Sequence, residues 1–147
     1  MRKYKLGLDI EKIDRIISRD MDANIIHAVG DKVTVSQAYV IDFMINTDKE
    51  DIFQKDLEKQ FDLKRAAISL MLNNMEKNDL IKRVPVSEDA RLKKLVLTEK
   101  SIALADTITT AIDEIENTLL EDLIQEEIDT FYTVLNKMRN SLSKRKG

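Results

Sequence analysis

The side chains best suited to contact a ligand are basic, and they lie in one stretch of the chain. Residues 64–94 carry eight Lys or Arg and four Asp or Glu. By contrast, residues 1–63 carry ten basic and thirteen acidic side chains, and residues 95–147 carry six basic and ten acidic ones. The net charge of the chain is −3. A basic stretch in an acidic chain is typical of a surface that contacts one polyanion, although a plain solvated surface shows such runs too.

Covalent catalysis has almost no candidate residues in this chain. The sequence contains no Cys and a single His, His27, which excludes a thiol nucleophile, a disulfide framework and thiolate metal sites. No Gly-rich phosphate loop, cluster of metal ligands or pair of nucleophile and base is present. We therefore predict that the protein is not an enzyme and has no metal site and no cofactor.

Length and composition favour one helical domain. The 147 residues are 43% hydrophobic and 35% charged, which is enough apolar material for a single core. With three Gly and one Pro, the chain lacks the turn signals that an all-β fold needs about every 8–12 residues. No apolar run approaches the roughly 18 residues of a membrane span, so we expect a soluble, cytoplasmic protein without a membrane partner.

The spacing of apolar residues predicts where the helices lie. Apolar residues recur with a helical period from Ile10 to Ala28, and Gly30 ends that helix. Thr34 and Gln37 have the spacing of a capping box, which predicts a second helix over residues 35–45. A short helix over residues 55–61 centred on Leu57, a break at residues 62–63 and a helix over residues 64–77 follow with helix-turn-helix spacing. The apolar side of this last helix is predicted to contain Ala67, Ile68, Met71, Leu72 and Met75.

The pattern then changes to strands and returns to helices. Residues 80–84 and 92–97 predict a two-stranded ribbon with a charged tip over residues 85–91. Thr98 is placed to cap the next helix, whose apolar positions are Ile102, Ala105, Ile108, Ile112, Ile115 and Leu119. A final seam with heptad spacing, which requires a partner helix, contains Ile128, Phe131, Leu135, Met138 and Leu142.

The stretch from Gln54 to Ser101 resembles the winged helix-turn-helix core of the MarR family of bacterial transcriptional regulators. The matching motifs are Leu80 with Arg83 at the entry to the wing, Asp89-x-Arg91 in the wing, and Leu97-Thr98 at the start of the next helix. Gly is frequent in the family where this chain has Asp62, Asp79 and Ser101. The resemblance implies a mainly α fold with a small β-wing, formed by a DNA-binding lobe over residues 33–99 and a helical dimerisation region over residues 5–32 and 100–144. It also implies a homodimer, double-stranded DNA as the partner and a small-molecule effector.

Within such a lobe, particular side chains are candidates for contacting DNA. Arg65, Ala66, Ser69 and Asn73 lie in the N-terminal half of the helix over residues 64–77, the part of a recognition helix that meets base edges in the major groove. In the wing, Arg91 suits the narrow minor groove, and the Asp89 carboxylate can orient its guanidinium. Lys93 and Lys94 are predicted to contact phosphates.

The candidates for an effector pocket are aromatic. Tyr39 and Phe43 lie one helical turn apart on the second helix, and a cation for an anionic effector would have to come from Arg15 or Arg19. Core packing is the alternative role of the two rings. We expect a neutral or cationic aromatic compound if an effector exists.

These observations predict a homodimeric transcriptional regulator that binds a pseudo-palindromic operator. The alternative is a winged-helix module that binds proteins without sequence-specific DNA binding. The salt dependence of binding to random duplex DNA discriminates between the two.

Overall fold

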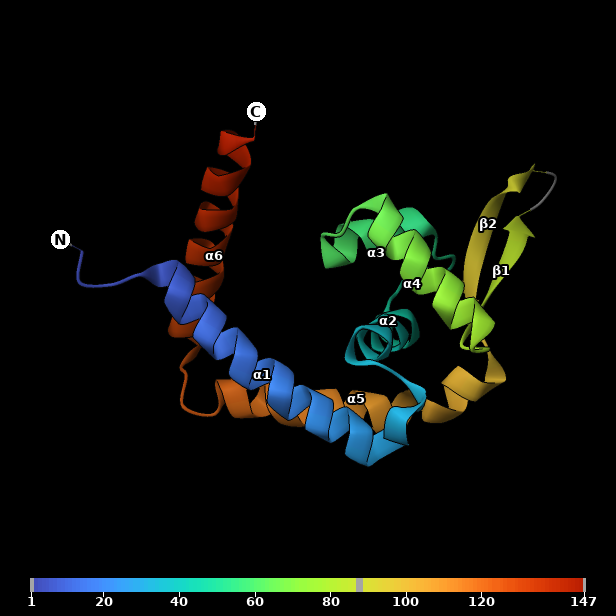
Figure 1. The fold of residues 1–147 in the computed structure, drawn as a ribbon, viewed down its shortest axis with the longest axis horizontal. Coiled ribbons are helices and arrows are strands. Elements are labelled where there is room, and N and C mark those ends of the chain that lie inside the picture. The colour runs from blue at the N-terminus through green and yellow to red at the C-terminus, as the bar shows by residue number, and fades with distance from the viewer. Residues whose placement is uncertain (1, 87–88, 147) are drawn as a thin grey trace. The chain divides into compact units, whose positions relative to one another are not determined.

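The computed structural model describes residues 2–86 and 89–146, which form helices and one small sheet (Figure 1). The elements are α1 (Leu6–Val29), η1 (Gly30–Lys32), α2 (Val35–Asn46), α3 (Gln54–Phe61), α4 (Arg65–Lys77), β1 (Ile81–Val86), β2 (Asp89–Leu97), α5 (Glu99–Leu120) and α6 (Gln125–Arg145). The predicted mainly α fold with a small β-wing is confirmed. Among the described residues, no helix is long and apolar enough to cross a membrane.

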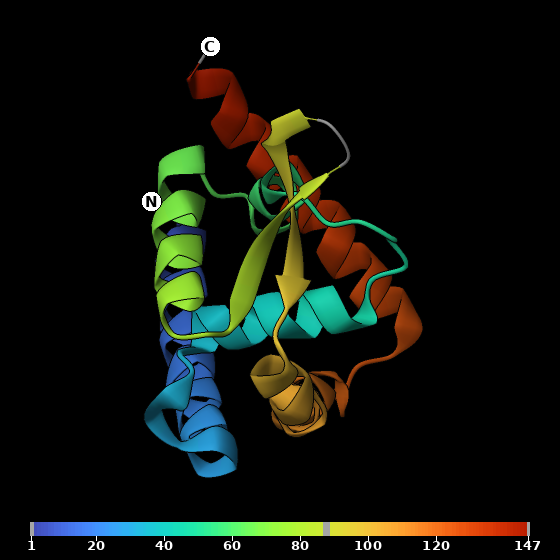
Figure 2. The ribbon, with the colours of Figure 1, turned by 90° about the vertical axis from the view of Figure 1, so that its right-hand side faces the viewer.

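The chain forms two compact units, Met1–Ile112 and Asp113–Gly147, with the boundary inside α5. The first unit contains α1 to β2 and the start of α5. In this unit α2 crosses below α4 and the two strands, which lie beside each other (Figure 2). The predicted division into residues 33–99 and residues 5–32 with 100–144 stays a prediction, because it concerns DNA binding and dimerisation.

Local capping sets the boundaries of α1 and α2. Gly30 ends α1 with φ 70°, a left-handed conformation that glycine adopts without a steric penalty. The Gln37 N–H donates to Thr34 Oγ1 at 3.2 Å, and the Thr34 N–H donates to Gln37 Oε1 at 3.1 Å. This reciprocal pair is the predicted capping box, and α2 begins directly after Thr34.

The two short helices that precede the wing bury a narrow apolar stripe. Leu57 of α3 and Ile68, Leu72 and Met75 of α4 are fully buried. Ala67 is exposed and Met71 is half-buried, so the prediction that both belong to the buried side was too broad. Ile68, Leu72 and Met75 are spaced four and three residues apart and form one narrow stripe along the helix, and Ala67 lies outside it.

Two Asp residues hold the left-handed turns that flank α4. Asp62 ends α3 with φ 50°, and Asp79 follows α4 with φ 59°. Among residues with a Cβ atom, Asp and Asn tolerate this conformation best. Both positions are ones where glycine is frequent in the family that the sequence resembles, so the backbone turn is kept although the residue type differs.

The wing is longer than the sequence pattern predicts. The strands are antiparallel, pairing Ile81 with Leu97 through Pro85 with Lys93, and the register shifts before Val86 pairs with Asp89. Pro85 and Arg91 therefore lie within strands and not in a loop. Pro85 is tolerated because β1 is an edge strand of a two-stranded sheet, where a missing N–H need not break a pairing.

Hydrogen bonds anchor the base of the wing to the helices. The Leu95 N–H donates to the Ile52 carbonyl oxygen at 2.7 Å. The Thr98 hydroxyl donates to the Asp79 carbonyl oxygen at 2.6 Å, and its oxygen accepts from the Ser101 N–H at 3.2 Å. The prediction that Thr98 caps the following helix is thus confirmed.

Several apolar positions of the long helices are exposed. In α1, Met21 and Ile25 are buried, but Ile10 and Ile13 are 46% and 51% exposed. Of the apolar positions predicted for α5, Ile108 and Ile112 are buried, whereas Ile102 is 54% exposed. No residue of α6 is buried, and Phe131 and Leu142 of its predicted seam are exposed.

Candidate nucleic-acid interface

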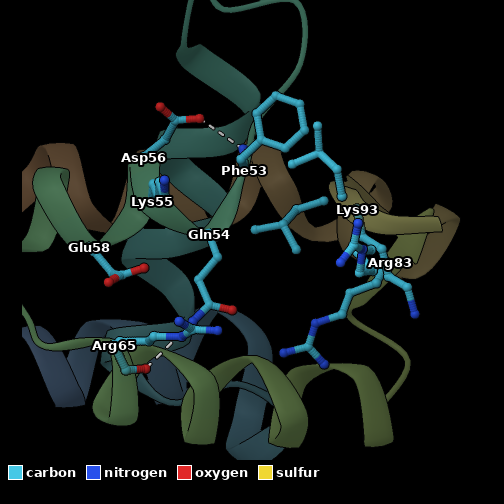
Figure 3. Close-up of a pocket in the computed structure, with 11 residues that line it drawn as sticks. Phe53, Gln54, Lys55, Asp56, Glu58, Arg65, Arg83 and Lys93 are labelled. Atoms are coloured by element: carbon cyan, nitrogen blue, oxygen red, sulfur yellow. Dashed lines mark hydrogen bonds between the residues drawn. The ribbon is translucent and has the colours of Figure 1, made fainter. Parts of the chain in front are cut away.

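A cleft of about 630 Å³ lies between α3, α4 and the wing (Figure 3). Its lining residues are Phe53, Gln54, Lys55, Asp56, Glu58, Arg65, Arg83, Arg91, Leu92, Lys93 and Leu95. Five of them are cationic and two are acidic, so the excess of positive charge in residues 64–94 is concentrated where two elements meet. Three of the predicted DNA contacts, Arg65, Arg91 and Lys93, share this cleft.

The exposed side of α4 is centred on Leu70. Positions 66, 70, 73 and 77 recur at helical spacing opposite the stripe of Ile68, Leu72 and Met75. Ala66, Asn73 and Lys77 are exposed, and Leu70 is 65% exposed. Leu70 was not among the predicted DNA contacts of this helix, which were Arg65, Ala66, Ser69 and Asn73. Helical periodicity could have identified it, because residue 70 falls outside the buried stripe.

Ser69 lies at the border of this exposed side and is held by α3. The Gln54 side-chain amide donates to Ser69 Oγ at 2.8 Å and reaches the Arg65 carbonyl oxygen at 3.5 Å. Figure 3 shows Gln54 extending from α3 toward α4. Ser69 is half-buried, and its oxygen already accepts one hydrogen bond. Its hydroxyl proton can still be donated to an acceptor outside the protein.

Asn73 is held from the other side by the wing. Arg83 Nη1 donates to Asn73 Oδ1 at 2.9 Å and to Glu76 Oε1 at 3.2 Å. Because Arg83 contacts the amide oxygen, it orients the Asn73 side chain so that the NH₂ group is left for other acceptors. Arg83 was predicted from the sequence only as part of the motif at the entry to the wing, and its contact with Asn73 was not predicted.

The basic residues of β2 lie on two different faces of the wing. Arg91 and Lys93 are exposed and line the cleft beside α4. Lys94 is half-buried, and its Nζ lies 3.4 Å from Asp51 Oδ1. It lines a separate hollow with Met44 and Val96. Alternation along a strand explains this separation of neighbouring lysines. Asp89 belongs to β2, but its side chain lies outside the described part of the chain, so its predicted contact with Arg91 stays a prediction.

An acidic residue fixes the start of α3, which carries Gln54. The Phe53 N–H donates to Asp56 Oδ2 at 2.8 Å, and Lys49 forms an ion pair with the same carboxylate. The hydrogen bond from Lys49 is the largest cause that lowers the pKa of Asp56 below its ordinary value. Burial opposes it, and the Phe53 N–H bond and nearby lysine charges lower the pKa further. The start of α3 is therefore stabilised by a charged carboxylate.

The residues predicted for an effector pocket lie on two helices of the first unit. Tyr39 and Phe43 are half-buried on α2, and the Phe43 ring packs edge-on against Phe61 at a centroid distance of 6.1 Å. Arg15 and Arg19 are exposed on α1, where Arg15 pairs with Glu11 and Arg19 with Asp20. The Phe43 ring therefore packs against α3, while the effector pocket and the alternative core role of the two rings both stay predictions.

Within residues 2–86 and 89–146, no group of three or more His, Cys, Asp or Glu residues could hold a metal ion. The polar groups that line the cleft are five side-chain cations, the Gln54 amide and the carboxylates of Asp56 and Glu58. Cations with a few fixed polar groups suit an anionic surface that must be bound in a defined orientation.

Comparisons with known proteins agree with this arrangement. Residues 31–92 match the model of the MarR family, and this range includes α2 to the first part of β2. The transcription regulator MarR from Oenococcus oeni PSU-1 is 25% identical, with a TM-score of 0.82 over 92% of this chain and 99% of that chain.

Two structures of MepR from Staphylococcus aureus are also similar. MepR in its DNA-binding conformation is 25% identical, with a TM-score of 0.79, and a MepR–DNA complex is 24% identical, with a TM-score of 0.81. Both matches cover 95% of this chain and 99% of MepR. The family match covers α2, the helix-turn-helix and the first part of the wing, and with this agreement in fold the chain has the winged helix fold of the MarR family.

Proposed function

We propose that the protein is a transcription regulator that binds a pseudo-palindromic site on double-stranded DNA as a homodimer. In this proposal α4 enters the major groove, and the wing contacts the neighbouring minor groove through Arg91, whose guanidinium the Asp89 carboxylate orients. The major groove of B-DNA is wide enough for a helix, whereas the minor groove focuses negative potential that attracts Arg.

The observation that carries the proposal is the shared cationic cleft. Arg65 at the start of α4 and Arg91 and Lys93 of β2 line the same space. Arg83 of β1 lines it too and is bonded to Asn73 on the exposed side of α4. Cations placed between a helix and a wing are suited to the phosphates that separate two adjacent grooves. The acidic remainder of the chain would repel the same polyanion. The similar MepR has been solved in complex with DNA.

The homodimer is supported by apolar side chains that the single chain leaves exposed. On α1 these include Leu6, Ile10, Ile13 and Ile16, and on α6 they include Phe131 and Leu142. Burial of such residues in a second copy stabilises the dimer by about 25 cal/mol per Å². A two-fold dimer would present two copies of α4 to half-sites about 34–36 Å apart.

The proposal includes regulation by a small molecule. Tyr39 and Phe43 on α2, with Arg15 and Arg19 of α1 as available cations, are the candidate pocket residues. An effector changes DNA affinity only if it binds one spacing of the two α4 helices better than another, and a tenfold change requires about 1.4 kcal/mol of differential affinity. Neutral or cationic aromatic compounds that stabilise the protein in a thermal shift screen should also change operator affinity.

The test is a titration of random duplex DNA at several salt concentrations, together with sedimentation. A linear fall of log K with log salt is expected, because phosphate contacts release counterions. Sedimentation at low micromolar concentration should give twice the 17.0 kDa mass of the chain. No measurable affinity for duplex DNA at low salt would contradict the proposal and favour the protein-binding alternative, and a folded monomer would contradict the homodimer.

A further inference from the structure

A strongly exposed position of α4, residue 70, carries an aliphatic side chain. Leu70 is 65% exposed and lies opposite Ile68, Leu72 and Met75, which are fully buried. Ala66, one turn earlier, is exposed on the same line of the helix. The α4 helix therefore presents an apolar strip at the centre of the surface that faces away from the core.

The charges around this strip indicate what covers it. Lys64 and Arg65 precede it and Lys77 follows it. On the wing side, Arg83 of β1 contacts Asn73, which lies on the same exposed side of α4. An apolar strip framed by cations is complementary to a surface that is anionic at its edges and apolar at its centre. The major groove has this character at A·T pairs, because phosphates border it and the C5-methyl group of thymine projects into it.

We propose that Leu70, with Ala66 as a second contact, recognises thymine methyl groups, so that each half-site contains A·T pairs beneath the N-terminal half of α4. This inference rests on the proposed function and specifies how the same surface selects its DNA. Residues four apart on a helix are roughly 6 Å apart along its axis, close to two base steps of roughly 3.4 Å each. The two side chains therefore reach methyl groups within about two base steps of each other.

The neighbouring polar residues assign the other contacts. Ser69 and Asn73 flank Leu70 and are oriented by Gln54 and Arg83. Hydrogen bonds from these two side chains require acceptors such as N7 or O4 on the bases beside the methyl contact. Leu70 itself offers no hydrogen bond, so its contribution depends on the methyl group alone.

The experiment begins with selection of duplexes from a random pool by the intact protein. In the selected half-site, each thymine is then replaced singly by uracil, which lacks only the methyl group. Affinities are measured for the wild-type protein, for Leu70→Ala and for Leu70→Met. Leu70→Ala shortens the side chain so that it no longer extends to the methyl group, whereas Leu70→Met retains an apolar side chain of similar length. Both substitutions keep good helix formers at an exposed position, and thermal unfolding checks that each variant is folded.

For wild type we expect about a fourfold loss of affinity at one or two of the uracil positions, as for the loss of one buried methyl group. Leu70→Met should keep this sensitivity, and Leu70→Ala should lose it. Equal wild-type affinity for thymine and uracil at every position would overturn the inference and leave DNA binding itself intact. Uracil sensitivity that persists unchanged in Leu70→Ala would also overturn it, since another residue would then contact the methyl. Absence of binding to any duplex is a different result, because it contradicts the proposed function.

Discussion

Arg83 of β1 and Asn73 of α4 are joined by a hydrogen bond of 2.9 Å between Nη1 and Oδ1. This bond connects the wing to the exposed side of α4, and Glu76 holds the same guanidinium nitrogen at 3.2 Å. The orientation of Asn73 therefore depends on the wing. In the proposed complex, Arg83 acts on base contacts by positioning Asn73.

This relationship predicts that Arg83 and Asn73 act together on DNA binding. Arg83→Lys keeps the charge but loses the planar guanidinium, so we expect a loss on the order of 1 kcal/mol for the selected half-site. Asn73→Ala should cost a similar amount. Because both changes remove the same oriented amide, the double variant should lose less than the sum of the two single variants. Fully additive losses in a fluorescence titration would show that Arg83 does not position Asn73.

The wing and α4 should differ in how they contribute to affinity. Arg91→Ala should weaken binding to selected and random duplexes alike and reduce the salt slope by about one, because it removes a contact with the backbone and minor groove. Arg65→Ala and Ser69→Ala should cost about 1–3 kcal/mol on the selected duplex and much less on random DNA.

A matched control for Arg91→Ala is Lys12→Ala, which removes an exposed cation from α1. Titrations of the selected and the random duplex at two salt concentrations distinguish variants that lose a DNA contact from variants that do not. If Arg91→Ala behaves like Lys12→Ala, the wing does not contact DNA.

The left-handed turn after α4 offers a test of stability. Asp79 has φ 59° and is exposed, so Asp79→Gly relieves backbone strain without removing a packed side chain. We expect the free energy of unfolding to rise by up to about 1 kcal/mol, because the relief of strain exceeds the entropy cost of glycine. Asp79→Ala should lower it, since Ala tolerates a positive φ less well. Urea denaturation measures both, and a less stable glycine variant would contradict this account of the turn.

The Asp56 carboxylate predicts a specific response to acid. Its pKa is lowered in the folded protein by the bonds from Lys49 and the Phe53 N–H. A lowered folded pKa means that the stabilisation is present above the unfolded pKa, about 3.9, and is lost as the pH falls through the folded pKa. Wild type should therefore lose stability more steeply below about pH 4 than Asp56→Asn. Parallel pH profiles of the two proteins in thermal unfolding would show that the carboxylate contributes nothing.

Local patterns predicted much of the fold. The capping box of Thr34 and Gln37, the burial of Leu57 and the stripe of Ile68, Leu72 and Met75 all depend on residues three or four positions apart. The full length of the wing was not predicted because strand pairing around Pro85 depends on residues of the opposite strand.

The candidate site was predictable as a set of residues but not as an arrangement. The bonds from Gln54 to Ser69 and from Arg83 to Asn73 join different elements, which periodicity along one helix does not reveal. The exposure of Leu70 could be predicted from its position opposite the buried stripe. Its proposed contact with DNA could not, because that depends on the wing placing its cations near α4.

The most direct test of the central claim is a hydroxyl-radical footprint of the intact protein on the selected duplex and on DNA flanking its own coding region. Two copies of α4 in successive major grooves predict two protected regions, related by two-fold symmetry and centred about 10–10.5 base pairs apart or a multiple of that spacing. Cleavage that stays uniform along both DNAs, at protein concentrations well above those that saturate the titration, would contradict the account.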